Sequence, residues 1–130
     1  MPSKPRVLLA DDHESVLCGA RALLELEFDV VGAVSDGEAL VQAAEELKPD
    51  VMVVDVEMPV LSGIEAARRL KSIHPEGKIV FMSIYGTPAI IQEALSTGAL
   101  GYVLKTSADD DLVEAVREAL EGRTFISPTL

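Results

Sequence analysis

The chain has 130 residues, 48% of them hydrophobic, which suits one domain with a sizeable core. Its 22 acidic residues outnumber its 11 basic ones, and the formal charge of -11 would repel nucleic acid, so this chain alone is not expected to bind DNA or RNA. One cysteine excludes an internal disulfide, and no apolar run approaches the length of a membrane span; both observations favour a cytoplasmic protein without a membrane partner.

The first predicted element is a strand at residues 7–10, an apolar run closed by Asp11 and Asp12. Its continuous apolar character is typical of a strand buried on both faces. Over residues 13–27 the apolar positions recur at helical spacing, which predicts an amphipathic helix. Residues 29–34 are rich in valine and predict the second strand.

A second helix and a third strand follow. The segment Ser35–Glu38 has the pattern of a capping box and predicts a helix that continues through Leu47. Residues 51–54 are all apolar and end at Asp55, and Pro59 then forces the chain out of the strand. A carboxylate at such a strand end faces the crevice where open α/β sheets bind their ligands.

Two helices flank the predicted fourth strand. Residues 62–65 form another capping box, for a helix that should end before Pro75. Residues 78–84 predict the strand, with Ser83 near its end. Threonine followed by proline then predicts the start of a helix over residues 87–98.

The last strand and helix close the predicted domain. Residues 100–104 predict a short fifth strand that ends at Lys105. The final helix opens at Ser107 with acidic residues in its first turn, and Gly122 stops it. We therefore expect one domain over residues 1–122, with residues 123–130 as the start of a linker or a C-terminal tail.

Five strands alternating with five helices predict a doubly wound α/β fold, because right-handed crossovers place helices on both faces of a parallel sheet. The carboxyl ends of the strands then share one edge of the sheet. Five polar residues fall at these ends: Asp11, Asp12, Asp55, Ser83 and Lys105.

Three carboxylates at one edge require a cation, since two of them about 4 Å apart repel by roughly 4 kcal/mol at an effective dielectric near 20. Oxygen ligands suit Mg²⁺, which is usually held by one or two carboxylates together with phosphate oxygens. A carboxylate that can attack phosphorus, a metal ion, an ammonium group and a hydroxyl make a complete phosphoryl-transfer site.

The ordered set of residues resembles the receiver domain of two-component response regulators. The resemblance covers essentially the whole chain and rests on Asp11-Asp12, Asp55, Met58-Pro59, Gly63, Ser83 and Gly101-Tyr102-Val103-Leu104-Lys105. It implies the flavodoxin-like (βα)5 fold, with a five-stranded parallel sheet in the order 2-1-3-4-5.

The resemblance also implies a role for each site residue. Asp55 would accept a phosphoryl group from a histidine kinase, and Lys105 would pair with the phosphate. The implied Mg²⁺ ligands are Asp11 mainly through water, Asp12 and Asp55 by their side chains, and Glu57 through its backbone carbonyl. Ser83 would move to the phosphoryl group while Tyr102 turns inward, which would alter the surface formed by the fourth helix, fifth strand and fifth helix.

Two further features are similar to the subgroup of receivers that precede a LuxR/NarL-type helix-turn-helix domain: His13 after the acidic pair, and the ending Phe125-Ile126-Ser127-Pro128. We therefore expect this chain to control a DNA-binding domain that it does not itself contain. Whether phosphorylation drives homodimer formation is left open. Thr106 stands where many receivers have proline, so the geometry of the Lys105-Thr106 bond is also left open.

Two alternatives belong to other classes. Asp55-Val56-Glu57 resembles the nucleophile motif of haloacid-dehalogenase-like phosphatases, but it follows the third strand and leaves the first acidic pair unexplained. The chain could also be a free-standing or degenerate receiver that acts as a docking module. We favour a signalling protein that acts on its own aspartate over an enzyme with turnover. We also expect Cys18 to be a small core residue, and His13 and His74 to be surface residues without metal-ligating partners.

Overall fold

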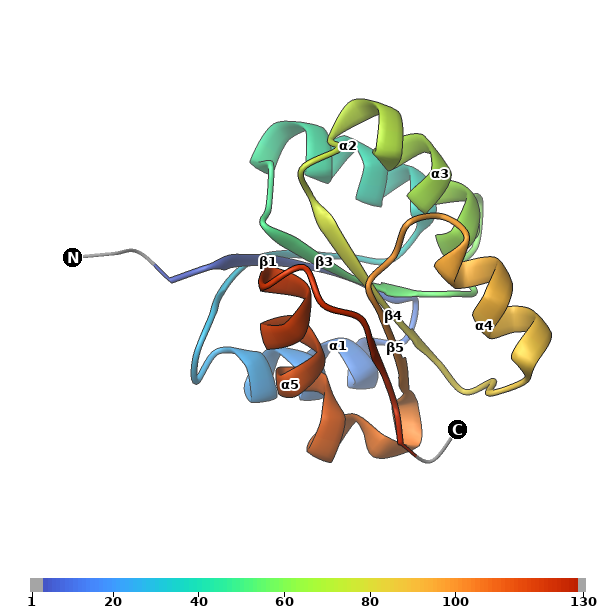
Figure 1. Cartoon of the computed structure of the whole chain (residues 1–130). Coiled ribbons are helices and arrows are strands. Elements are labelled where there is room, and N and C mark those ends of the chain that lie inside the picture. The colour runs from blue at the N-terminus through green and yellow to red at the C-terminus, as the bar shows by residue number, and fades with distance from the viewer. Residues whose placement is uncertain (1–3, 129–130) are drawn as a thin grey trace.

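Strands and helices alternate along the chain in the computed structural model, which describes residues 4–128 (Figure 1). The strands are β1 Arg6–Ala10, β2 Asp29–Val34, β3 Val51–Asp55, β4 Lys78–Ser83, β5 Gly101–Leu104 and β6 Phe125–Ile126. The helices are α1 Glu14–Leu24, α2 Gly37–Leu47, α3 Gly63–Ile73, α4 Pro88–Leu95 and α5 Ala108–Leu120, with the short 3-10 turn η1 Lys105–Ser107 before α5. No helix within residues 4–128 has both the length and the apolar character needed to cross a membrane.

All strand pairs are parallel, and the sheet order is β2-β1-β3-β4-β5-β6. This confirms the doubly wound fold and the predicted order of the first five strands. The sheet has one strand more than predicted, because the tail turns back and pairs with β5. Phe125 packs into the core there, and the backbone N–H of buried Ser127 donates to the carbonyl of Tyr102 at 3.0 Å. The expected domain boundary at residue 122 stays a prediction.

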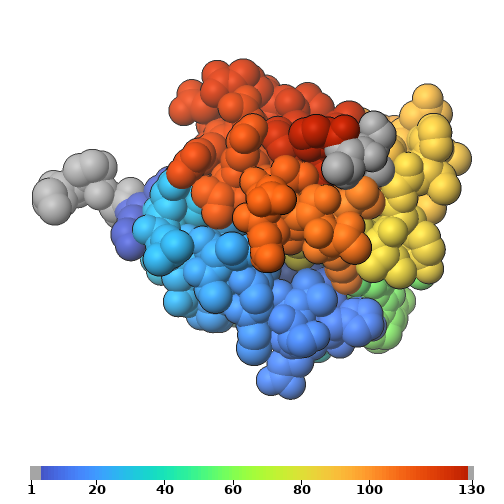
Figure 2. Space-filling model, turned by 90° about the horizontal axis from the view of Figure 1, so that it is seen from below, coloured from blue at the N-terminus to red at the C-terminus, as the bar shows by residue number. Residues whose placement is uncertain are grey.

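Two hydrophobic layers lie on opposite faces of the sheet. Successive strand residues point to opposite sides, so Leu8 and Met52 pack under α2 and α3, whereas Leu9 and Val53 pack against α1 and α5. Figure 1 shows α2, α3 and α4 on one face and α1 and α5 on the other. In the view from below, α1 lies against α5 (Figure 2). Both layers end at the carboxyl edge, where the polar residues begin.

The helix starts agree only in part with the predicted caps. Ser62 caps α3 as expected, with its Oγ accepting from the N–H of Glu65 at 3.2 Å. The cap of α2 is Asp36 and not Ser35, because the Asp36 carboxylate reaches the N–H of Ala39 at 2.8 Å. Helix α1 ends at Leu24, three residues before the predicted end, and α4 likewise stops at Leu95.

The predictions made for Cys18 and His74 are wrong. Cys18 is exposed, because the buried stripe of α1 runs through Ala20 and Leu24 and leaves residue 18 outside it. His74 is buried, since its Nε2 lies 2.8 Å from the carbonyl oxygen of Pro49 and must donate to it. His74 therefore ties the end of α3 to the turn before β3.

Candidate functional site

The predicted polar residues lie at the carboxyl ends of neighbouring strands, along one edge of the sheet. Asp11 follows β1, Asp55 ends β3, Ser83 ends β4 and Lys105 follows β5. Asp11, Asp55 and Ser83 are 1%, 4% and 1% exposed, which is unusual for polar side chains. The fold thus brings together residues that are far apart in the sequence, as their positions at strand ends predicted.

Lys105 lies between the two buried carboxylates. Its Nζ is 2.8 Å from Asp11 Oδ2 and 3.1 Å from Asp55 Oδ2. Asp11 Oδ2 nevertheless has no aligned hydrogen-bond donor among the described residues. One ammonium group is therefore shared by two buried carboxylates.

The acidic cluster extends outward through Asp12 and His13. The N–H of His13 donates to Asp11 Oδ1 at 2.9 Å, and its ring Nδ1 lies 3.2 Å from that oxygen and 3.1 Å from Asp12 Oδ1. Ligand atoms of Asp11, Asp12, His13 and Asp55 all lie within 4.8 Å of one another. His13 is exposed, as predicted, but the expectation that it lacks a partner at metal-ligand spacing is wrong, because three carboxylates lie within that distance.

Burial and neighbouring charges have opposing effects on the pKa values of Asp55 and Lys105. Burial raises the pKa of Asp55, the charge of Asp11 raises it further, and the Glu57 N–H and Lys105 oppose them without prevailing. Burial lowers the pKa of Lys105, but its contacts with Asp11 and Asp55 outweigh burial, and the pKa ends above its ordinary value. Lys105 therefore stays charged at neutral pH beside a carboxylate whose ionisation is costly.

We expect Asp55→Asn to make the apo protein more stable at neutral pH. The raised pKa means that folded Asp55 holds its proton more tightly than in the unfolded chain, so its favourable contribution is present below its ordinary pKa of 3.8 and is lost as pH rises through the raised folded value. The variant should melt at a higher temperature than wild type above this window, and the difference should disappear below pH 3.8. Thermal melts without divalent cations measure it, and a variant that melts lower at pH 7 would contradict the sign.

A pocket of about 200 Å³ opens over the cluster. Its walls are Asp12, His13, Asp55, Glu57, Ser83, Ile84, Tyr85 and Lys105. Glu57 is exposed, and its backbone N–H donates to Asp55 Oδ1 at 3.2 Å. One carboxylate oxygen of Asp55 thus faces a backbone donor and the other faces Lys105.

The loop after Asp55 has little freedom. Gly63, at the start of α3, donates its N–H to the carbonyl of Val56 at 2.9 Å. A Cβ at this glycine would lie 2.0 Å from the carbonyl oxygen of Asp55. Between them Val60 has a φ of 70°, and Leu61 N–H donates to Pro59 O at 2.7 Å, which is a strained three-residue turn for a β-branched residue. The loop after Asp55 is therefore constrained by the close approach of Gly63 to the Asp55 carbonyl and by the hydrogen bond from Gly63 to Val56.

Ser83 and Tyr102 both hold the backbone of Tyr85. Ser83 Oγ accepts from the Tyr85 N–H at 2.9 Å, and the Tyr102 hydroxyl donates to the Tyr85 carbonyl at 2.6 Å. Tyr102 is 0% exposed, and burial raises the pKa of its hydroxyl. The ring is thus already turned inward in this structure. Tyr85 was not predicted as part of the site, because only the fold brings its backbone between these two hydroxyls.

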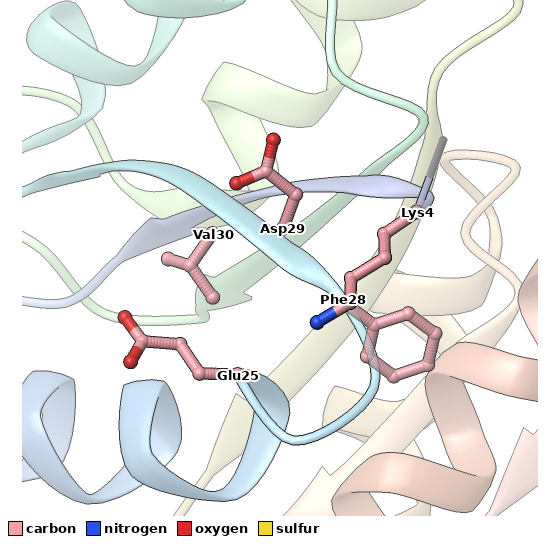
Figure 3. Close-up of a pocket in the computed structure, with 5 residues that line it drawn as sticks. All are labelled: Lys4, Glu25, Phe28, Asp29 and Val30. Carbon is pink, nitrogen blue, oxygen red and sulfur yellow. The ribbon is translucent and has the colours of Figure 1, made fainter. Parts of the chain in front are cut away.

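The pocket drawn in Figure 3 lies at the opposite edge of the sheet. Its volume is about 370 Å³, and it is lined by Lys4, Glu25, Phe28, Asp29 and Val30. The carboxylates of Glu25 and Asp29 point to different sides and do not converge (Figure 3). The carboxyl edge, where charged groups converge, is therefore the better functional site.

The fold and the edge site together define a doubly wound α/β domain with an acidic pocket at its carboxyl edge. Residues 7–117 match the response regulator receiver domain, and the chain belongs to that family. It is a receiver domain of the kind found in two-component response regulators, as the sequence predicted.

Relatives in sequence are transcriptional regulators. The transcriptional regulatory protein DegU of Brevibacillus brevis is 37% identical over 128 residues, covering 97% of this chain and 54% of that protein. The response regulator GacA of Pseudomonas viridiflava is 38% identical over 127 residues, covering 96% and 59%. The chain therefore spans little more than half the length of these relatives.

Solved structures that resemble this chain include receiver domains of other response regulators. The signal receiver domain of NarL from Mycobacterium tuberculosis is 34% identical with a TM-score of 0.89, over 94% of this chain and all of that chain. The isolated receiver domain of RcsB from Salmonella enterica serovar Typhimurium, in the presence of the phosphomimetic BeF3-, is 31% identical with a TM-score of 0.89, over 98% of this chain and 96% of that one. The predicted likeness to LuxR/NarL-type regulators is confirmed.

Proposed function

We propose that this chain is a phosphorylation switch in which Asp55 accepts a phosphoryl group from a histidine kinase. The observation that carries the proposal is the position of Asp55, a buried carboxylate at a strand end whose Oδ2 lies 3.1 Å from Lys105 Nζ. The pocket above it leaves an approach for a phosphodonor.

The reaction forms one bond and breaks one. A carboxylate oxygen of Asp55 attacks phosphorus, a P–O bond forms, the P–N bond to the donor histidine breaks, and the imidazole leaves with the electron pair and takes a proton. Lys105 already lies where it can balance charge on the transferred oxygens. The raised pKa of Asp55 makes its ionised form a high-energy ground state, so charge compensation in the pocket favours the attack.

The residues present fit a magnesium ion. Asp11, Asp12 and Asp55 offer carboxylate oxygens, and Asp11 Oδ2 is buried without an aligned donor. We assign the ion to these three side chains, with Asp11 acting mainly through water, and to the backbone carbonyl of Glu57. Bound there, Mg²⁺ would neutralise carboxylates and phosphoryl oxygens.

The switch would act through Tyr85. To reach a phosphoryl group on Asp55, the Ser83 hydroxyl has to leave the N–H of Tyr85, which then needs a new partner. Tyr102 still holds the carbonyl of the same residue, so the loop would pivot about that contact. Ile84 and Tyr85 are exposed apolar side chains beside Ser83, and their surface would change with it.

The output would be control of a DNA-binding domain through the surface of α4, β5 and α5. The relatives named above are a transcriptional regulatory protein and a response regulator, of which this chain covers 54% and 59%, and this supports the role. One RcsB structure contains two dimers bound to two parallel DNAs, and homodimer formation on phosphorylation is proposed here by analogy. The docking-module alternative has less support, because the acid pair, the acceptor and the lysine all converge.

Incubation with Mg²⁺ and acetyl phosphate tests the proposal. Intact mass spectrometry should show wild type gaining one phosphoryl group, and the gain should be absent without Mg²⁺ or in Asp55→Asn. Asp50→Asn is the matched control, because Asp50 lies at the opposite end of β3, and it should be modified like wild type. Modification that persists in Asp55→Asn would reject the assigned acceptor, and steady phosphate release from phosphomonoesters would support the phosphatase alternative.

A further inference from the structure

The tail strand β6 returns the chain to the edge of the sheet that carries Asp55. Helix α5 begins after β5 and therefore ends at the opposite edge, and β6 then runs parallel to β5. Figure 1 shows this tail in dark red, running back beside β5 from the end of α5. Ser127 directly follows β6 and is 1% exposed. A buried serine therefore lies beside the end of the strand that precedes Lys105.

Ser127 makes two contacts with the backbone of β5. Its N–H donates to the carbonyl of Tyr102 at 3.0 Å, and its Oγ accepts from the N–H of Leu104 at 3.1 Å. In a regular parallel ladder the acceptor for Leu104 would be the backbone carbonyl of Ser127. The hydroxyl takes its place, so this contact depends on which side chain stands at position 127 and not only on the pairing of the strands.

Leu104 is the last residue of β5 and directly precedes Lys105. Its backbone is paired with Ser83 of β4 on one side and bonded to Ser127 on the other. The ammonium group of Lys105 lies 2.8 Å and 3.1 Å from the two buried carboxylates, and its side chain is only 12% exposed. Because a packed side chain has little freedom to compensate for a shift of its backbone, the position of Leu104 determines where the ammonium group lies.

We propose that Ser127 is a positioning residue for the phosphorylation of Asp55, acting through Leu104 to hold Lys105 at the pocket. The inference rests on the proposed function, because it concerns the rate of that reaction. Lys105 balances charge on the transferred phosphoryl oxygens, so an ammonium group that is displaced stabilises the transition state less. Ser127 is not among the residues that line the pocket, and its effect passes through β5.

A phosphorylation assay on Ser127→Ala measures the effect. The substitution removes the hydroxyl and keeps the N–H that pairs with Tyr102. With Mg²⁺ and acetyl phosphate, we expect the initial rate of modification to fall by roughly threefold to tenfold, the range that one lost hydrogen bond covers when it is converted to a rate. Thr124→Ala is the matched control, because it removes an exposed hydroxyl from the same tail, and it should react like wild type.

Two further variants separate positioning from a general loss of stability. Val7→Ala removes packing near the amino end of β1, in the core layer that also holds Phe125 but away from the site. It should lower the melting temperature and leave the rate of modification near that of wild type. In Lys105→Met, addition of Ser127→Ala should cause no further loss of rate, because the lysine through which Ser127 acts is gone.

Amide hydrogen exchange tests the same contact without a phosphodonor. The amide of Leu104 should exchange several-fold faster in Ser127→Ala than in wild type, whereas the amides of β1 should not change. Unchanged protection of Leu104, a wild-type rate of modification, or a further loss of rate in the Lys105→Met background would overturn the proposal. Absence of modification in wild type would instead reject Asp55 as the acceptor, while the exchange of Leu104 would still report on the contact with Ser127.

Discussion

Gly63→Ala should lower the free energy of unfolding by roughly 3 kcal/mol or more and slow the phosphorylation of Asp55. The new Cβ would lie 2.0 Å from the carbonyl oxygen of Asp55 and 3.0 Å from a methyl group of Val54. Both belong to the buried strand β3, whose backbone cannot yield without loss of its pairing on two sides. The clash therefore moves either the acceptor or the start of α3.

Urea unfolding and the rate of acetyl phosphate modification measure the two effects. Gly19→Ala is the matched control, because a Cβ at this exposed position in α1 meets nothing within 4 Å. It should stabilise the protein by about 0.5–1 kcal/mol, as expected for glycine replaced by alanine within a helix. Equal stability of Gly63→Ala and wild type would show that the loop can retreat from the side chain.

Lys105→Met should be the most damaging single change within the site. It removes the ammonium group from two buried carboxylates, 2.8 Å from one and 3.1 Å from the other, and loss of one partner of a buried pair costs about 3–5 kcal/mol. The loss should be largest at neutral pH, where Asp55 is ionised, and should shrink as pH falls and Asp55, whose pKa is raised, takes up its proton. Millimolar Mg²⁺ should recover part of it.

Denaturant unfolding at pH 7 and at pH 4, with and without Mg²⁺, tests this expectation. Lys71→Met serves as control, since Lys71 is exposed on α3 and should change stability little. In Lys105→Met/Asp55→Asn the cost should be smaller than in Lys105→Met alone, because one of the stranded charges is gone. A cost that does not depend on pH would indicate lost packing of the lysine stem instead.

The sequence predicted the centre of the site because chain order and strand order are linked in this fold. Asp11, Asp55, Ser83 and Lys105 each follow a short apolar run, and parallel pairing brings all such ends to one edge. The periodicity needed to locate the runs is local. No knowledge of side-chain contacts was required.

The wrong predictions concern residues whose local sequence pattern does not show whether the side chain points into the core or toward solvent. The apolar neighbours of Cys18 in the sequence suggested a core position. The buried face of α1 runs through Ala20 and Leu24, and Cys18 lies outside that face. The burial of His74 depends on the carbonyl of Pro49, a contact across 25 residues. The closeness of His13 to the acids could have been predicted, because His13 directly follows Asp11 and Asp12 and precedes the first residue of α1.

The contacts of Tyr85 and the strand β6 could not be read from the sequence. Both depend on how segments that are separated in the sequence approach one another in the folded domain. The strand β6 has two residues, Phe125 and Ile126, and is too short to show a periodicity. The tail that contains it therefore resembles a linker in sequence.

Strand β6 also constrains the length of the chain that precedes it. Gly101 is opposite Phe125 and Tyr102 is opposite Ile126, with the phenylalanine facing the core and the isoleucine facing solvent. Inserting or deleting one residue between α5 and β6 would exchange the two faces and carry Ser127 away from Leu104, whose N–H it accepts at 3.1 Å. Apart from Gly122, whose φ of 75° disfavours other residues, substitutions in that connection should thus be tolerated more readily than changes in its number of residues.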